Sequence, residues 1–299
     1  MKKLVLVFAL MAFSLVSFAQ LRYNLEIGEK YGLKQLTIQD ITQTVQGMTQ
    51  NIKNTIGGDL LFTIKSKDGN VYTSDFVFAS LIFKMESPMF SMGYDSNDSN
   101  QEENEMTKLF KSIVGYSFTM KFNDKGEILE VDGFEKLMEK VKAESGGQAS
   151  GPIQESLKSQ FSDESMKQSL ASMLIVYPDG KPKTGLSWNT TIEQSGAMPL
   201  ISKYNYKISS ANSSVVEMEG AGTMATKEGF SQERMGMTQH FDLKGDVTMN
   251  AKINAKTGWP ITIKQTQDLS GNVSIESAQL PAPMEMPMSI KGESTFSEF

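Results

Sequence analysis

Val114-Gly-Tyr-Ser-Phe-Thr-Met-Lys-Phe-Asn-Asp-Lys-Gly-Glu-Ile-Leu-Glu-Val-Asp-Gly-Phe-Glu-Lys-Leu-Met-Glu-Lys-Val141 is the stretch that decides the fold. In its first third, apolar and polar residues alternate, which is the period of a strand with one buried face. The apolar members are Tyr116, Phe118, Met120 and Phe122. A turn is expected next, with Gly126 in the left-handed conformation. The chain is then predicted to return as a second strand through Leu129 and Val131.

The hydrophobic period of this stretch changes to that of a helix in its last third. Apolar residues fall there at positions i, i+3, i+4 and i+7, namely Phe134, Leu137, Met138 and Val141. Asp132, followed by Glu135, predicts a capping pair at the start of the helix. The stretch therefore predicts a β-hairpin that leads directly into a helix.

Further strands are predicted on both sides of this stretch. They are expected at 31–45, 60–64, 72–78, 81–85, 188–192, 204–208, 215–218, 234–241, 247–253, 259–263 and 289–296. A short helix is expected at 106–113, and a longer helical region between Pro152 and Leu174. The predicted fold class is α+β and mostly β: one or more large antiparallel curved sheets, or a half-barrel, with two to four helices inserted in the middle of the chain.

The predicted domains follow this order of elements. They are a signal peptide at 1–19, an N-terminal sheet half with the helices at 20–180, and a C-terminal sheet half at 181–299. The turn from Lys252 to Gly258 is similar to the turn from Lys121 to Gly126. The two halves are therefore either variants of one sheet unit or parts of one continuous domain. Three prolines are expected to break the chain before the last strand, Pro281, Pro283 and Pro287.

The N-terminus has the pattern of a secretory signal. Lys2 and Lys3 precede an apolar run from Leu4 to Val16, and Ala19 stands before Gln20, where cleavage is expected. The chain has no cysteine, which excludes disulfides and lipid attachment at a cysteine. No later stretch is long and apolar enough for a membrane-spanning helix. We expect an exported protein, periplasmic or extracellular, with no transmembrane segment in the mature chain.

Charge and residue types narrow the range of possible partners and activities. The chain has 29 Lys and Arg against 35 Asp and Glu, a net charge of −6, and one histidine. An acidic chain without basic clusters argues against nucleic acid as a partner. We find no nucleophile–base constellation, Gly-rich phosphate loop or histidine metal pair, and so expect no enzyme, no cofactor and no metal site. A carboxylate pair of the glycosidase kind stays open because acidic residues are numerous.

Methionine is the one compositional excess, with 20 residues. Two groups are spaced by two residues, Met235-Gly-Met237 and Met284-Glu-Met286-Pro-Met288. Thioethers at that spacing can hold Cu(I), whereas methionine elsewhere fills irregular cores or lines adaptable apolar surfaces. If 235–241 is one strand, His240 lies on the face opposite Met235 and Met237. A copper site there would lack its nearest nitrogen ligand.

Aromatic and methionine side chains on strand faces are the candidate ligand-binding residues. In a closed sandwich they would be core. On a curved sheet that helices only partly cover, they would line a cleft for an acyl chain, with the helices as its lid. The candidates are Phe118, Met120, Phe122, Tyr204, Tyr206, Met235 and Met237.

Several motifs resemble an exported bacterial family of unknown function. They are the signal peptide without a lipobox, Gly93-Tyr-Asp-Ser96, the stretch from Val114 to Gly133, and Gly185-Leu-Ser-Trp188. The resemblance covers most of the mature chain and implies no activity, because that family has none assigned. In its element order the chain is more loosely similar to the half-barrel carriers of lipoproteins and lipids, the LolA and LppX type.

Three hypotheses for function follow. The first is an exported, non-enzymatic protein that binds or carries a lipid or another hydrophobic ligand in the cell envelope. The second is a structural or protein-interaction module of the envelope without a small ligand, which a dry and filled core would favour. The third is a methionine-based copper-binding protein. The expected partner is thus a hydrophobic small molecule or an envelope protein.

Overall fold

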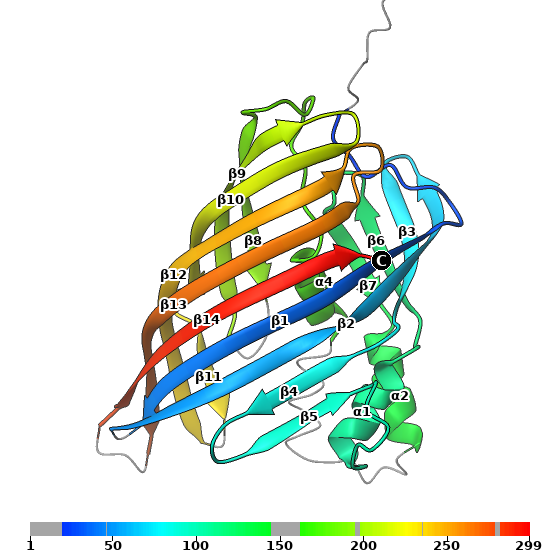
Figure 1. Ribbon diagram of the computed structural model, residues 1–299. Coiled ribbons are helices and arrows are strands. Elements are labelled where there is room, and N and C mark those ends of the chain that lie inside the picture. The colour runs from blue at the N-terminus through cyan, green and yellow to red at the C-terminus, as the bar shows by residue number, and fades with distance from the viewer. Residues whose placement is uncertain (1–19, 46, 145–161, 195–197, 235, 279–281) are drawn as a thin grey trace, which may run out of the picture.

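Figure 1 shows the computed structural model, in which long slanted strands form one sheet. The structure describes residues 20–45, 47–144, 162–194, 198–234, 236–278 and 282–299. Within these ranges, 14 strands belong to a single sheet, and every strand pair in it is antiparallel.

The elements of the N-terminal part are β1 (Lys30–Val45), β2 (Met48–Asp68), β3 (Val71–Phe78), β4 (Ile82–Glu86), β5 (Ser91–Asp95), α1 (Glu105–Ile113), β6 (Phe118–Asn123), β7 (Ile128–Asp132), α2 (Phe134–Glu144) and α4 (Asp163–Ala171). Those of the C-terminal part are β8 (Ser187–Gln194), β9 (Leu200–Ala211), β10 (Val215–Thr226), β11 (Ser231–Arg234), β12 (Met237–Asn254), β13 (Pro260–Ser277) and β14 (Met284–Glu298).

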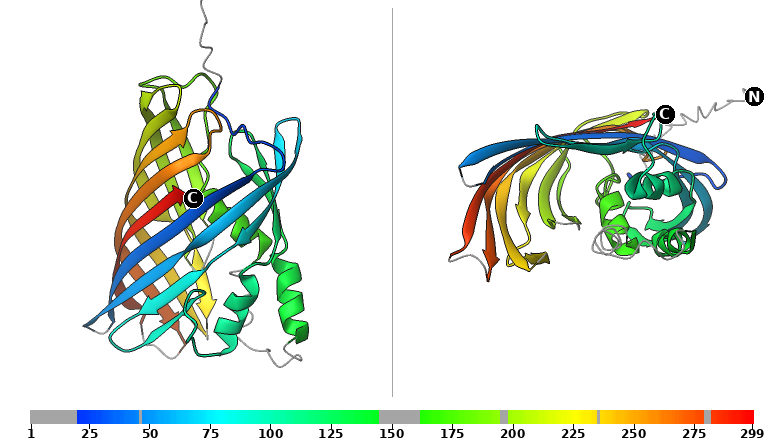
Figure 2. Two further views of the ribbon diagram at one scale, coloured as in Figure 1. Left: turned by 45° about the vertical axis from the view of Figure 1, so that its right-hand side comes forward. Right: turned by 90° about the horizontal axis from the view of Figure 1, so that it is seen from below.

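The strand order brings the first and last strands together. Along the sheet it runs β7-β6-β3-β2-β1-β14-β13-β12-β10-β9-β8, while β4, β5 and β11 pair outside this path. Figure 2 shows that the sheet curves strongly and that the helices lie on its concave side. α4 contacts both β7 and β8, the two ends of the strand order, and so bridges the opening of the curved sheet. These observations confirm the predicted fold class.

Local sequence explains the strands well. β3 alternates between buried and half-buried residues along its whole length, as expected for a strand with one face in the core. The hairpin predicted from the stretch at Val114 is β6 and β7, and Gly126 in its turn has φ 98°. The left-handed conformation predicted for Gly126 is therefore confirmed. The predicted hairpins of β2 with β3 and of β12 with β13 are also observed.

An N-terminal segment without regular structure, 20–29, holds two of these hairpins together. The backbone N–H of Tyr23 donates to the carbonyl of Asp124 in the β6–β7 turn at 2.8 Å. The N–H of Asn24 donates to the carbonyl of Thr257 in the β12–β13 turn, also at 2.8 Å. The two similar turns seen in the sequence thus contact the same segment.

Aromatic side chains of this segment and of the hairpins belong to one apolar core. Tyr23 and Trp259 are almost completely buried, and their rings meet edge to face at 6.2 Å. The ring of Phe118 on β6 stacks on that of Phe134 on α2, with 3.9 Å between centroids. This stacking attaches α2 to the hairpin that precedes it.

The predicted capping pair at α2 is wrong. The N–H of Phe134, the first helical residue, donates to the carboxylate of Asp163 on α4 at 2.8 Å. Asp132 instead ends β7, and its carboxylate pairs with Lys136. The capping residue comes from an element distant in the sequence, so no local sequence motif at α2 could have predicted it.

Two predictions for the C-terminal part are also corrected. The strand expected at 234–241 is interrupted, because β11 ends at Arg234 and β12 begins at Met237, with Gly236 at φ 72° between them. Pro287 does not break the chain but lies inside β14, opposite Asn272. Its missing N–H is tolerated because the pairing of β14 with β1 ends at Met288, so one edge of the strand is free there.

Some predictions lie outside the described residues. These are the signal peptide at 1–19, the part of the helical region from Pro152 to 161, and the chain break expected at Pro281. The division into sheet halves at residue 180 stays a prediction. No helix in the described ranges has the length and hydropathy that crossing a membrane requires.

We expect Gly126→Ala to lower the free energy of unfolding by roughly 2–4 kcal/mol, as backbone strain combined with overpacking. The φ of 98° disfavours a side chain, and a Cβ would clash with the carbonyl oxygen of Ile175 and the ring of Tyr23. Urea denaturation measures the loss. In the control Gly69→Ala nothing lies within 4 Å of the added Cβ, so only the left-handed penalty of roughly 1–2 kcal/mol is expected. Equal losses in the two variants would contradict the packing role of Gly126.

Candidate functional site

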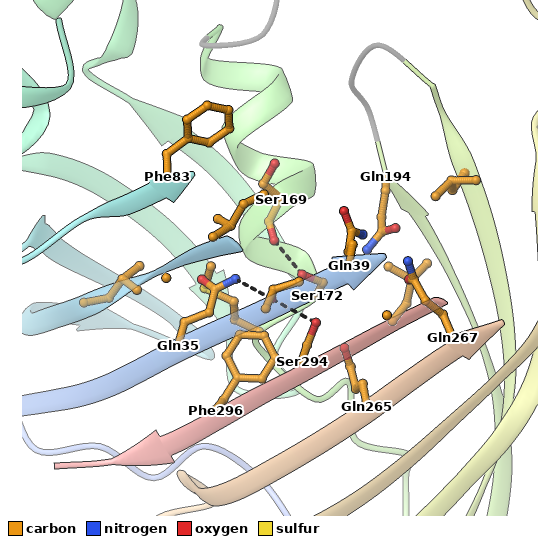
Figure 3. Close-up of a pocket in the computed structure, with 18 of the residues that line it drawn as sticks. Gln35, Gln39, Phe83, Ser169, Ser172, Gln194, Gln265, Gln267, Ser294 and Phe296 are labelled. Atoms are coloured by element: carbon orange, nitrogen blue, oxygen red, sulfur yellow. Dashed lines mark hydrogen bonds between the residues drawn. The ribbon is translucent and has the colours of Figure 1, made fainter. Parts of the chain in front are cut away.

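A cavity of about 480 Å³ lies between the concave face of the sheet and the helices. Strands from both parts of the chain line it, together with residues of α1, α2 and α4 (Figure 3). Most of the lining side chains are apolar, among them Leu60, Phe110, Ile113, Met166, Val247 and Phe296. Both the volume, within the range of roughly 300–1,000 Å³, and the apolar lining are typical of small-molecule sites.

A polar band crosses the sheet wall of this cavity. Alternate residues of β1 contribute to it, and the register places β14 and then β13 beside them: Thr37 faces Ser294, which faces Gln265, and Gln39 faces Gly292, which faces Gln267. We define the polar band as Gln35, Thr37, Gln39, Gln265, Gln267 and Ser294, all of which line the cavity.

Apolar residues flank the polar band on both sides. Toward one end of the strands the next row is Ile41, Ile290 and Leu269, which are neighbours in the same register. Toward the other end, Phe296 faces Ile263. The band is therefore a strip of amides and hydroxyls inside a concave face that is otherwise apolar.

Part of the polar band is held by its own hydrogen bonds. Thr37 Oγ1 donates to Ser294 Oγ at 2.9 Å, across the contact between β1 and β14. Gln35 Nε2 lies 3.4 Å from Thr37 Oγ1, to which it donates. Gly292 leaves space for Gln267, since a Cβ there would lie 2.9 Å from Gln267 Cγ. The two hydrogen bonds fix the hydroxyls of Thr37 and Ser294. The absence of a side chain at Gly292 leaves room for the amide of Gln267.

Two buried polar atoms in the cavity wall have no hydrogen-bond partner within the described ranges, Gln267 Nε2 and Ser202 Oγ. Ser202 lies on β9, and only 2% of its surface is exposed. A buried polar group without a partner costs about 1–3 kcal/mol, so such atoms are uncommon in folded proteins. A fold selected for stability alone would favour apolar residues at these two positions.

The lining is electrically neutral. Among the described residues that line it there is no Asp, Glu, Lys, Arg or His. Burial raises the pKa of Tyr204 to about 12, so its hydroxyl stays protonated near neutral pH. The cavity thus offers hydrogen bonds but no ionic partner.

The sequence-predicted candidates are distributed between this cavity and the core. Tyr204 lines the cavity. Tyr206 is buried beside it, with the two rings stacked at 5.2 Å. Three others, Phe118, Met120 and Phe122, are each 1% exposed and lie in the core outside the lining. Met237 begins β12 and is not part of the lining, and Met235 lies outside the described residues.

The polar band was missed by the sequence analysis. Its signal is the spacing of two residues in Gln35-x-Thr37-x-Gln39 and in Gln265-x-Gln267, which places uncharged polar side chains on one strand face. The first group lies within the predicted strand 31–45, whose alternation of apolar and polar residues is imperfect for this reason.

The methionine groups were the other candidate site. Met284, Met286 and Met288 fall at alternate positions of β14 and so share a face. Across β13, the register places Met237 and Met284 on that same concave face. Within the described ranges, no group of three or more His, Asp or Glu side chains has the arrangement of a metal site. Copper binding by the methionines stays a prediction.

Comparison with known proteins identifies a matching family and a solved structure of similar fold. Residues 69–260 match the model of a family of unknown function (DUF6263). The chain matches no curated protein. It is similar to a structure described as lipid–protein interactions in lipovitellin, with 7% identity and a TM-score of 0.50 over 92% of this chain and 25% of that one. It also aligns with the outer membrane protein OprG from Pseudomonas aeruginosa, with 7% identity and a TM-score of 0.27 over 94% and 99% of the chains.

These structural likenesses have a limited meaning. The chain spans about a quarter of the lipovitellin chain, and at 7% identity the likeness shows a shared fold alone. The TM-score of 0.27 with OprG is too low to establish a shared fold.

We expect Gln267→Leu to raise the free energy of unfolding by about 1–2 kcal/mol, because it removes a buried donor without a partner and nearly keeps the volume of the side chain. Urea denaturation of the ligand-free protein checks this. The control is Gln43→Leu on β1, which removes a hydrogen bond of 3.1 Å to Gln50 and should bring no gain. A loss of stability in Gln267→Leu as large as in the control would contradict our interpretation of the band.

Proposed function

Because the chain belongs to the family of unknown function DUF6263, no activity comes with its family, and we propose from the cavity itself that the protein binds a hydrophobic small molecule such as a lipid. The observation that carries this proposal is a cavity of about 480 Å³ with a mainly apolar lining. A module without a small ligand is expected to have a filled core, since protein interiors are close-packed. The cavity therefore favours a ligand over that alternative.

The arrangement of the helices supports the same proposal. α1, α2 and α4 each contribute side chains to the lining, which agrees with the lid expected from the sequence. α4 also contacts both β7 and β8, so it covers the cavity where the curved sheet does not. In this proposal a bound molecule is shielded from water by the helices on one side and the sheet on the other.

We further propose that binding is not coupled to catalysis and takes place in the cell envelope. In the described ranges the lining supplies amides, hydroxyls and apolar groups for binding, but no His, Asp, Glu or Lys side chain for proton transfer. The secretory pattern from Lys2 to Ala19 supports export. Carriage of a hydrophobic molecule through water is a function that fits both features.

Blocking the cavity should abolish binding. Ile192 lines the cavity from β8, whereas the neighbouring Thr191 is exposed on the other face of the strand. We expect the neutral fluorescent probe N-phenyl-1-naphthylamine to bind the wild-type protein saturably and one to one. Ile192→Trp should weaken this binding about tenfold or more, because the larger indole projects into the cavity and takes up space that the probe would occupy. Fluorescence titration measures both.

The matched control is Thr191→Trp, which adds the same indole on the outer face of β8 and should leave the affinity unchanged. The proposal fails if the wild-type protein shows no saturable binding. It also fails if the two tryptophan variants bind the probe equally well, because binding would then lie outside the cavity.

A further inference from the structure

We propose that the natural ligand is an uncharged lipid with ester and hydroxyl groups beside a hydrocarbon chain, such as an acylglycerol. The polar band and Ser202, which lies three strands away from β13 in the sheet, recognise separate polar groups of it. The inference rests on the proposed function, since it assumes that the cavity holds a ligand. It adds the chemical class of the ligand and the residues that select it.

The lack of charged side chains among the described lining residues argues against an ionic ligand group. A carboxylate or phosphate in the cavity would lose its hydration, and the part of the lining that the structure describes has no Lys, Arg or His to pair with it. A cation would likewise find no Asp or Glu among these described lining residues. A free fatty acid at neutral pH and a phospholipid head group are therefore poor occupants.

The polar band excludes a plain hydrocarbon as well. Gln267 Nε2 and Ser202 Oγ are buried in the wall without a partner in the described structure. A hydrocarbon would fill the space and leave both atoms unsatisfied, and a site built to hydrogen-bond a ligand rejects an analogue that lacks the polar group. The favoured ligand has polar atoms that reach these two positions.

The chemistry of the two atoms indicates which polar groups fit. An amide N–H such as that of Gln267 donates, and so needs an acceptor such as an ester carbonyl. The hydroxyl of Ser202 both donates and accepts, and so matches either an ester or a hydroxyl. Since Ile41, Ile290 and Leu269 form an apolar row beside the band, the ligand continues as hydrocarbon beyond its polar group.

Three probes of similar chain length separate the possibilities: 1-monooleoylglycerol, which is neutral and has an ester and hydroxyls; oleate, which is charged; and 1-octadecene, which has no polar group. Each is titrated into the full chain at neutral pH, and binding is measured by native mass spectrometry and by displacement of N-phenyl-1-naphthylamine. We expect 1-monooleoylglycerol to bind about tenfold or more tightly than the other two.

Substitutions in the wall then connect this preference to the two atoms. The double variant Gln267→Leu/Ser202→Ala should lose about tenfold or more in affinity for 1-monooleoylglycerol and keep or improve its affinity for 1-octadecene. Retained 1-octadecene binding shows that the variant is folded and its cavity intact. Gln43→Leu, outside the cavity on the same strand as Gln39, should keep the wild-type order of affinities.

The outcomes distinguish this inference from the function on which it rests. If no probe binds, including N-phenyl-1-naphthylamine, the proposed function fails. If the probes bind but oleate or 1-octadecene binds as tightly as 1-monooleoylglycerol, the cavity binds hydrophobic molecules and only the inference is overturned. A double variant with the wild-type preference would also overturn it.

Discussion

Antiparallel pairing of β1 with β14 is the constraint on which the rest of the structure depends. It joins the two ends of the chain over a register from Leu33 with Glu298 to Gln43 with Met288. Without it there would be two separate sheets, one from β7 to β1 and the other from β14 to β8, with four exposed edges between them. The hydrogen bond between Thr37 and Ser294 lies on this contact, so the pairing that makes the sheet continuous also assembles the polar band.

Local patterns in the sequence predicted much of the fold. The alternation at Phe118, Met120 and Phe122 identified β6, and the helical spacing after Phe134 identified α2. Such patterns depend on which face of an element is buried, and that is determined largely by a few neighbouring residues. Gly126 was predicted for the same reason, because a tight turn needs a positive φ wherever it occurs.

The site was harder to predict because it depends on register between distant strands. Gln39 and Gln267 are separated by more than two hundred residues of chain, yet both face Gly292. Aromatic candidates such as Phe118 and Phe122 were chosen by residue type, and the structure buries them in the core, where large apolar side chains are most often found. Tyr204 reaches the cavity because β9 lies at the far side of the curved sheet.

The neutral polar band inside an apolar wall is thus the feature that a function has to explain, since its buried polar groups lower the stability of the ligand-free fold. The most direct test is a crystal structure of the protein with 1-monooleoylglycerol. Our account predicts the lipid in the cavity beneath α4, with an oxygen of its ester or glycerol within about 3 Å of Gln267 Nε2. A structure with the lipid bound elsewhere, or with Gln267 and Ser202 bonded to other protein groups and the cavity collapsed, would contradict it.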